Sequence, residues 1–249
     1  MTTANATKQT VPAQKIAVEA LDAFCLTTLL AAGAGEKTAR AATDAMMHGS
    51  RLGVDSHGVR LLDHYVTALE GGRIKREPQM RFVTEFGAIA TLDADAAHGA
   101  YAAYEAMRHA VSLAARFGIG AVAIRNSSHF GPAGAFAMEA VKAGYAGLCV
   151  CNSDSFVRLH EGAQRFHGTN PIAFAVPVAG ERPWLLDMAT SAIPYNRIQL
   201  YKSLGLPLPQ GTASDPNGQD VVDPHAADML APLGGAFGFK GRSRRCRRR

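Results

Sequence analysis

The chain changes its hydrophobic periodicity near Gly118, and this change limits the available folds more than any other feature of the sequence. Before that point, apolar residues recur at helical spacing over 14–33, 36–50 and the run that ends at 118. After it, short strand-type runs alternate with glycine-rich loops. A helix-rich first part and a strand–loop–helix–strand second part predict an α/β protein with an N-terminal helical part.

The expected strands are short and rich in apolar residues. Residues 81–86 and 88–92 flank Gly87, which predicts an antiparallel hairpin. Later runs of the same kind lie at 119–125, 145–151, 168–177 and 183–190. A helix is expected between the first two of these later runs, over 135–144.

Composition and cysteine usage indicate a soluble, intracellular protein. Hydrophobic residues make up 47% of the 249 residues and charged residues 19%, as in ordinary globular proteins. The N-terminal MTTANATKQTVPAQ lacks the apolar core of a signal peptide, and no apolar run is long enough to span a bilayer. The four cysteines show neither a paired CxxC nor a zinc spacing. These features predict a cytoplasmic location, no membrane association and no metal site.

The net charge of +5 comes from the last eight residues alone. Residues 242–249, RSRRCRRR, hold six arginines, and without them 20 basic residues face 21 acidic ones, a net charge of −1. Such a cluster can bind nucleic acid electrostatically, but no aromatic residue interleaves with it and no nucleic-acid motif precedes it. Nucleic-acid binding is therefore not expected. The tail is interpreted as an aberrant end, and a functional basic arm is the alternative.

Glycine-rich motifs do not form a standard Rossmann fingerprint. GIGAVA (118–123) fits G-x-G-x-x-A but lies at the start of a strand instead of a strand-to-helix turn. NSSHFGPAG (126–134) is better placed, because it leaves a strand and enters a helix whose free N–H groups can receive a phosphate. Gly131 and Gly134 would permit close approach, and His129 could contact a ligand. The alternative is a glycine-rich turn with a solvated histidine.

The stretch VDSHGVRLLDHY (54–65) places a serine, a histidine and an arginine together before a helix. One interpretation is an ordinary surface helix start with Ser56 as its cap. The other interpretation is that these side chains take part in proton transfer and substrate binding. An imidazole with a pKa near 6.5, such as that of His57, can accept or donate a proton near neutral pH. The planar guanidinium of Arg60 can bind a carboxylate through two N–H groups.

Four motifs taken together resemble the type-2 malate/L-lactate dehydrogenase family. They are SHG (56–58), SSHFG (127–131), GTNP (168–171) and LDMATS (186–191), and the resemblance runs from about residue 14 to Gly241. Relatives include ureidoglycolate, diketogulonate and sulfolactate dehydrogenases and cyclic imino-acid reductases. The resemblance implies a non-Rossmann, mixed-sheet, nicotinamide-binding fold, with homodimers among complete relatives. It also implies an NAD(P)-dependent oxidoreductase that interconverts a small 2-hydroxy acid and its 2-keto acid by hydride transfer.

The same resemblance implies roles for individual residues. His57 matches the family's catalytic acid/base, while Ser56 and Asp187 match residues proposed to relay charge and fix the ring tautomer. Arg60 and His129 are expected to bind a small carboxylate substrate. Several relatives have the arginine four residues after the histidine, whereas here it follows by three; both offsets lie on nearly the same helix face.

The expected cofactor is NAD or NADP, without a choice between them. By resemblance its cradle would consist of His129, Phe130, Gly131, Gly168, Thr169, Asn170, Thr190, Ser191 and Arg197. Arg197 lies in PYNRI, where relatives often have a glycine-lysine pair, so the positive charge is kept with a different reach.

The sequence predicts three parts. Residues 1–78 form a helical part that carries SHG, 79–241 an α/β cofactor-binding part, and 242–249 the basic tail. Family members continue beyond the GGAFGFKG-type motif, so the α/β part is expected to be incomplete, through C-terminal truncation. The alternative function is therefore an inactive remnant that acts as an interaction or nucleic-acid-associating protein through its arginine tail.

Overall fold

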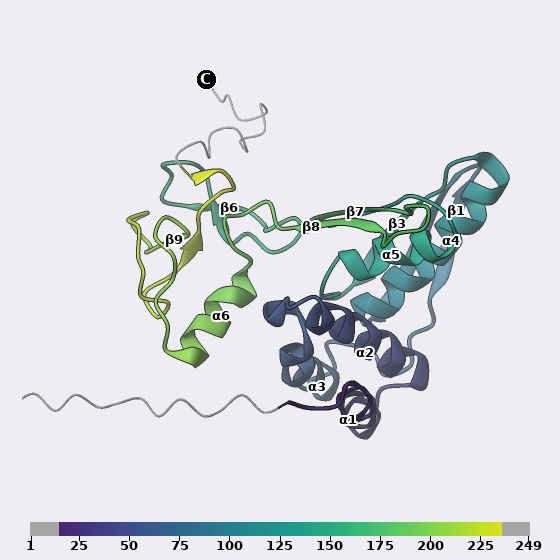
Figure 1. The fold of residues 1–249 in the computed structure, drawn as a ribbon, viewed down its shortest axis with the longest axis horizontal. Helices are drawn as coiled ribbons and strands as arrows, with labels where there is room; N and C mark the ends of the chain where they lie inside the picture. The colour runs from purple at the N-terminus through teal and green to yellow at the C-terminus, as the bar shows by residue number, and fades with distance from the viewer. Residues whose placement is uncertain (1–14, 236–249) are drawn as a thin grey trace, which may run out of the picture.

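The computed structural model describes residues 15–235, and its N-terminal part is a layer of helices (Figure 1). The helices are α1 (Val18–Ala31), α2 (Glu36–Arg51) and α3 (Leu62–Glu70), which pack around a core that includes Cys25, Leu29, Met46, Tyr65 and Leu69. Two 3-10 turns, η1 (Asp55–His57) and η2 (Val59–Leu61), connect α2 to α3. The predictions for the N-terminal 1–14 and for the basic tail 242–249 lie outside the described residues.

The SHG segment does not cap a helix. Ser56 makes no capping hydrogen bond and only 2% of its surface is exposed, while α3 begins six residues later at Leu62. The interpretation of Ser56 as the cap of a surface helix is therefore wrong. Two 3-10 turns take the place of a helix start.

The first sheet follows the helical layer. It contains β1 (Arg81–Phe86), β2 (Ile89–Ala97) and β3 (Ala121–Ser127) in that order. β1 and β2 form the predicted antiparallel hairpin, and the φ of +56° at Gly87 explains the glycine in its turn. β3 runs parallel to β2, and α4 (Gly99–Phe117) makes the crossover between them and packs on both strands.

The GIGAVA motif lies at the end of this crossover helix, which explains why it is not a dinucleotide fingerprint. Gly118 caps the C-terminus of α4 with a φ of +81°. A side chain on Gly120 would collide with the carbonyl oxygen of Ala110 in α4. These glycines serve helix termination and helix–strand packing.

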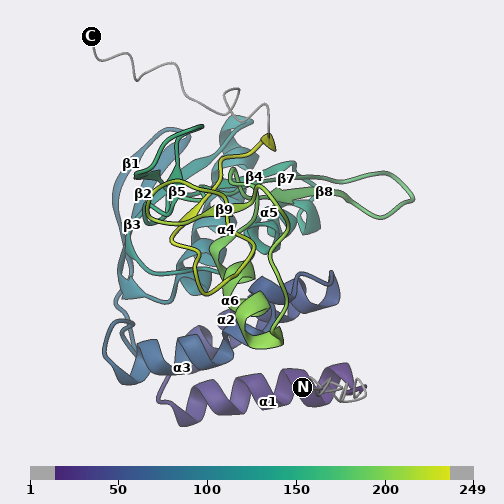
Figure 2. The same ribbon diagram turned by 90° about the vertical axis from the view of Figure 1, so that its left-hand side faces the viewer.

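The second sheet is antiparallel, in the order β4 (Gly147–Val150), β7 (Ile172–Val176) and β8 (Trp184–Met188). The helix α5 (Gly134–Lys142) packs against β4 and β7 on one side and against α4 on the other. The turn that joins β7 to β8 projects from the body of the molecule (Figure 2). The first sheet thus rests on α4 and the second on α5, and these two helices pack against each other.

A third sheet forms a lobe of its own with α6 (Tyr195–Leu204), at the left of Figure 1. Its strands are β5 (Val157–Arg158), β6 (Arg165–His167), β9 (Ala213–Ser214) and β10 (Met229–Leu230), in the order β6-β5-β10-β9. Its separate core includes Val157, Ile193, Ile198, Leu208 and Leu230. The sequence patterns predict neither α6 nor these strands. Strands of two or three residues are too short to show a periodicity, and α6 buries only Ile198, so it lacks a repeating apolar face.

The three sheets confirm the predicted α/β fold with mixed sheets and an N-terminal helical part. The expected runs in the middle of the chain are also strands, with bounds shifted by a few residues. The division at residues 78 and 79 stays a prediction. No helix within residues 15–235 is both long and apolar enough to cross a bilayer.

Candidate active site

Close packing of glycines on α2 positions the SHG segment. A side chain on Gly49 would lie 2.5 Å from the carbonyl oxygen of His57, and one on Gly58 would collide with Oγ of Ser50. The same Oγ accepts a hydrogen bond of 3.0 Å from the backbone N–H of Val59. The chain therefore passes directly over α2, and His57 is held on a rigid support.

His57 is partly buried between its neighbour and α6. Its Nδ1 lies 3.1 Å from Oγ of Ser56, and its Nε2 lies 3.5 Å from Nδ2 of Asn196. Burial, together with the nearby Arg197 guanidinium, lowers the pKa of His57 from 6.5 to about 4. The ring is therefore neutral at pH 7, and its pKa lies below the ordinary value near 6.5.

His129 lies beside His57 although 72 positions of chain separate them. The two rings are stacked, with centroids 5.9 Å apart. Nδ1 of His129 lies 3.0 Å from the hydroxyl of Tyr65, which comes from α3. Burial is the main cause that lowers the pKa of His129 to about 3, and the neighbouring His57 adds to it. The interpretation of His129 as a solvated residue in a glycine-rich turn is therefore wrong.

The glycine in the SSHFG motif is explained by Tyr65. Gly131 has a φ of +82°, and a side chain there would lie 3.3 Å from the Tyr65 hydroxyl. Phe130 stacks on Phe136 of α5 with ring centroids 5.1 Å apart. The two residues that follow His129 in the loop after β3 are thus fixed by packing.

The Asp187 carboxylate makes its hydrogen bond at the start of α5. Its Oδ2 accepts a bond of 2.8 Å from the backbone N–H of Gly134, the first residue of that helix. A side chain on Gly134 would lie 2.8 Å from the same oxygen. Ser56 therefore contacts His57, whereas the hydrogen bond of the Asp187 carboxylate is to the backbone of α5.

The two candidate cations have different surroundings. Arg60 is exposed and donates to Oγ of Ser203 and to the carbonyl oxygen of Gln199, both at 3.0 Å. It thus ties η2 to α6. The buried Nε of Arg197 has no hydrogen-bond partner among the described residues.

The GTNP and LDMATS motifs meet through hydrogen bonds. Oγ1 of Thr190 donates to the carbonyl oxygens of Thr169 and Asn170, at 3.1 Å each. Ser153 joins them, because its N–H donates to Oδ1 of Asn170 and its Oγ accepts from the Thr169 N–H. Gly168 packs so closely on Ser153 that no side chain would fit. This cluster is rigid and rich in hydroxyl and amide groups.

Ser191 lies at the edge of the same cluster but points into the protein. It is 2% exposed, and its Oγ donates to the carbonyl oxygen of Ile193 at 2.7 Å. Ser191 therefore shapes the backbone that leads to α6 in the structure.

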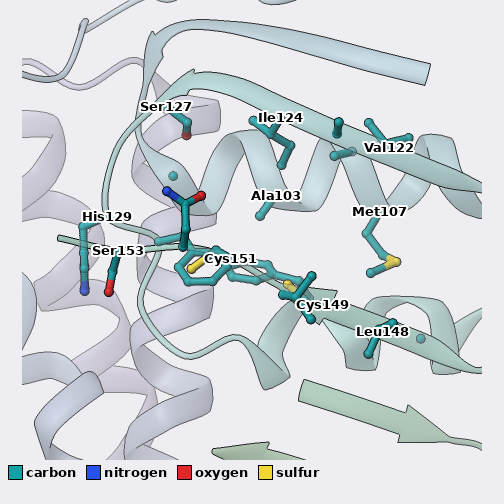
Figure 3. A pocket seen from close by; sticks show the side chains of 18 of the residues that line it. Ala103, Met107, Val122, Ile124, Ser127, His129, Leu148, Cys149, Cys151 and Ser153 are labelled. Carbon is teal, nitrogen blue, oxygen red and sulfur yellow. The ribbon is translucent and has the colours of Figure 1, made fainter. Parts of the chain in front are cut away.

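A cavity of about 1540 Å³ connects these features (Figure 3). Its polar end includes Ser56, Arg60, His64, Arg73, His129 and Ser153. Its apolar side includes Ala103 and Met107 of α4, Val122 and Ile124 of β3, and Leu148 of β4. Of the predicted site residues, Ser56, Arg60, His129 and Phe130 line the cavity directly, and Thr169, Asn170 and Thr190 support it through Ser153.

The cavity lining also limits the possible chemistry. Burial raises the pKa of Cys149 to about 12 and that of Cys151 to about 11, so both thiols are protonated at neutral pH. Within the described part of the chain, no group of three or more His, Cys, Asp or Glu side chains could hold a metal ion.

Sequence reasoning missed Ser153, Asn196 and the role of Tyr65. Ser153 lies in NSDS, a polar run directly after an apolar strand, and this position was a usable signal. Tyr65 lies on the buried face of α3, where a tyrosine gives no separate signal of a polar contact. Asn196 gave no signal, since nothing local links α6 to η1.

This chain is similar in sequence to a family model and to several known proteins. The family model described as malate/L-lactate dehydrogenase matches residues 16–243. Malate dehydrogenase of Pyrococcus abyssi is 36% identical over 224 residues, which are 89% of this chain and 62% of the relative. Ureidoglycolate dehydrogenase (NAD(+)) of Escherichia coli is 32% identical over 225 residues, with coverages of 90% and 64%.

A third relative and one solved structure extend the comparison. (2R)-3-sulfolactate dehydrogenase (NADP(+)) of Chromohalobacter salexigens is 34% identical over 228 residues, 91% of this chain and 66% of the relative. The crystal structure of malate dehydrogenase from Entamoeba histolytica superposes with a TM-score of 0.86 at 28% identity, over 92% of this chain and 67% of that one. The chain thus spans just under two thirds of the length of these curated relatives.

Proposed function

Because this chain belongs to the malate/L-lactate dehydrogenase family, we propose that it carries the site of an NAD(P)-dependent oxidoreductase for small 2-hydroxy acids. The reaction would interconvert a malate- or lactate-like acid and its 2-keto acid by hydride transfer. The observation that carries the proposal is a pair of stacked, neutral histidines: His129 lines the polar end of a large cavity, and His57 stacks on it.

His57 is the proposed acid/base. In the oxidation direction, the substrate hydroxyl gives its proton to Nε2 of His57 while a hydride leaves the same carbon. A ring with a pKa of about 4 is in the accepting form at neutral pH, which favours this direction. Ser56, 3.1 Å from Nδ1, orients the ring, and the long contact from Asn196 is one that a substrate hydroxyl can replace.

Arg60 and His129 are the proposed carboxylate-binding groups. Both line the cavity, and the Arg60 fork could exchange its contacts on α6 for a substrate carboxylate. Asp187 was predicted to relay charge to His57. That role stays a prediction. In the structure, the carboxylate of Asp187 accepts its hydrogen bond from Gly134 at the start of α5.

The cavity fits a nicotinamide dinucleotide in size and in chemistry. Its apolar side could cover a planar ring, and the hydroxyl and amide groups of its polar side match a ribose and a carboxamide. The residues proposed to hold the cofactor are His129, Phe130, Gly131, Gly168, Thr169, Asn170, Thr190, Ser191 and Arg197. Hydride acceptance is the chemistry that the nicotinamide supplies when bound. Relatives named for NAD(+) and for NADP(+) support either cofactor.

Two further properties belong to the proposal. A cytoplasmic location is supported by the cysteine pattern. A homodimer is supported only by the family resemblance, and gel filtration of the purified chain with light-scattering detection would test it.

The test is turnover of 2-hydroxy acids by the full chain, followed by nicotinamide absorbance with NAD and with NADP. His57→Asn should lower turnover by about 10²–10⁴-fold while cofactor binding changes little, because the imidazole acts on the substrate hydroxyl. The matched control is His225→Asn, an exposed loop histidine. Turnover of His57→Asn within a few-fold of the parent would contradict the assignment, and absence of both turnover and dinucleotide binding in the parent would contradict the function.

A further inference from the structure

Tyr65 and His129 form a hydrogen-bonded pair, and the burial of both side chains determines which of them is the donor. The Tyr65 side chain is fully buried, and its hydroxyl lies 3.0 Å from Nδ1 of His129. Among the described residues, this is the hydrogen bond of both the Tyr65 hydroxyl and the His129 ring. The His98 ring packs edge-on against Tyr65 at 4.2 Å between centroids and holds the phenol in place.

Burial decides which protons are present. It raises the pKa of Tyr65 far above its ordinary value, so the phenol keeps its hydrogen at neutral pH. It lowers the pKa of His129 to about 3, so the ring is neutral and carries a single N–H. The bond therefore joins a neutral phenol to a neutral imidazole.

Only one direction of this bond satisfies both groups. If Nδ1–H of His129 donated to the phenol oxygen, the buried phenol hydrogen would have no acceptor among the described residues. An unsatisfied buried donor destabilises the fold. If the phenol donates to Nδ1, a single bond satisfies both. The hydrogen of the imidazole is then on Nε2.

We propose that Tyr65 is a positioning residue that holds His129 as the Nε2–H tautomer and thereby provides the cavity with a neutral hydrogen-bond donor. His129 lines the cavity, and its bond to Tyr65 uses Nδ1, so Nε2 is the ring nitrogen left for a ligand. A neutral N–H donor suits the electron-rich oxygen of a carboxylate or a carbonyl group. The identity of that ligand rests on the proposed function, whereas the tautomer does not.

The arrangement would give two stacked histidines different tasks. His57, whose pKa is also lowered, exchanges the proton in the proposed reaction. His129 cannot accept a proton at Nδ1 as long as Tyr65 donates to that nitrogen, so it acts only as a donor. Proton transfer is thereby directed to one ring of the pair.

The test is a long-range ¹H–¹⁵N correlation spectrum of the full chain labelled with ¹⁵N-histidine, recorded at neutral pH. The His129 signals are assigned by their loss in His129→Gln. We expect a protonated Nε2 and an unprotonated Nδ1 whose resonance shows an accepted hydrogen bond. In Tyr65→Phe, that Nδ1 resonance should move toward the value of a nitrogen without a hydrogen bond, since the ring stays but the donor is removed.

The matched control is Tyr104→Phe, which removes the hydroxyl of another buried tyrosine and should leave the His129 resonances unchanged. A hydrogen on Nδ1 in the parent, or the same Nδ1 resonance in parent and Tyr65→Phe, overturns the proposal. Should Tyr65→Phe fail to fold, the parent spectrum still decides the tautomer. These readouts need no turnover, so their failure is distinct from a failure of the proposed function.

Binding of pyruvate tests the donor role, with histidine resonances of the parent and variants as the readout. His129→Phe should weaken pyruvate binding about tenfold, because a hydrogen bond to a charged group is lost. Tyr65→Phe should weaken it by a smaller factor, because the Nε2–H form then competes with the other tautomer. Equal pyruvate affinity in the parent, Tyr65→Phe and His129→Phe overturns the donor role.

Discussion

Burial keeps several histidine rings neutral near the candidate site. The pKa is lowered to about 4 for His57 and to about 3 for His98 and His129, mainly by desolvation. A neutral ring has one nitrogen that can accept a proton and one N–H that can donate a hydrogen bond. The same burial makes the folded state sensitive to acid, since protonation of these rings is easier in the unfolded chain.

The free energy of unfolding should therefore fall as the pH falls from about 6.5 toward about 4. In that window the unfolded chain binds more protons than the folded one, because the histidine pKa values are lower in the fold. Paired carboxylates such as Asp22 and Asp93 have lowered pKa values too, but their effect comes at lower pH. Urea unfolding across this range measures the dependence.

His129→Gln should flatten this pH dependence, because it removes one of the buried rings. His225→Gln, which changes an exposed histidine, should leave the dependence as it is in the parent. A parent protein equally stable at about pH 7 and about pH 5 would contradict the assignment of these rings as buried and neutral.

Among the structural elements, the start of α5 connects the candidate site to the second sheet. Asp187 on β8 accepts a hydrogen bond from the first N–H of α5, although burial raises the pKa of its carboxyl. The loop with His129 and Gly131 leads directly into this helix. The position of the loop thus depends on how α5 begins.

Asp187→Ala should lower the free energy of unfolding by about 1 kcal/mol, because the backbone N–H of Gly134 loses its hydrogen-bond acceptor. Denaturant unfolding measures the change, and Glu181→Gln in the exposed β7–β8 turn is the control for loss of a surface carboxylate. If stability is unchanged while turnover falls strongly, the carboxylate acts on the reaction, as the family resemblance implies, and its role at α5 is minor.

For the whole molecule, the main feature is the cavity between two open sheet edges. β3 pairs only with β2 and β4 only with β7 within the described residues, and both free edges border the cavity. Ile119, Leu148 and Val150 are each more than half exposed beside it. Exposed apolar side chains next to unpaired strand edges are typical sites of association.

The full chain should therefore bind a hydrophobic fluorescent dye and self-associate as its concentration rises. Leu148→Glu should reduce both, because it places a charge on the exposed side of β4. Leu204→Glu on α6 is the control, since Leu204 is 54% exposed against 60% for Leu148 but lies away from the cavity. Dye fluorescence and light scattering measure the effect; equal reductions by the two variants would contradict a special role for the β3–β4 region.

The sequence by itself determined the long elements and the family. Helices such as α4 and strands such as β7 follow from hydrophobic periodicity, because that periodicity records which side of an element is buried. The family followed from four short motifs, and the match over residues 16–243 confirms it. Gly118 and Gly131 were visible as special positions, because a positive φ leaves few alternatives to glycine.

Only the tertiary structure decided which side chains meet. Tyr65 and His129 are 64 positions apart, and Asn196 reaches His57 across 139 positions. No local pattern records such contacts, because they depend on how helices and loops pack after they form. The same packing removes water from His57 and His129 and so lowers their pKa values. The residue types could be read from the chain, but their protonation and their partners arise from desolvation and close packing in the folded molecule.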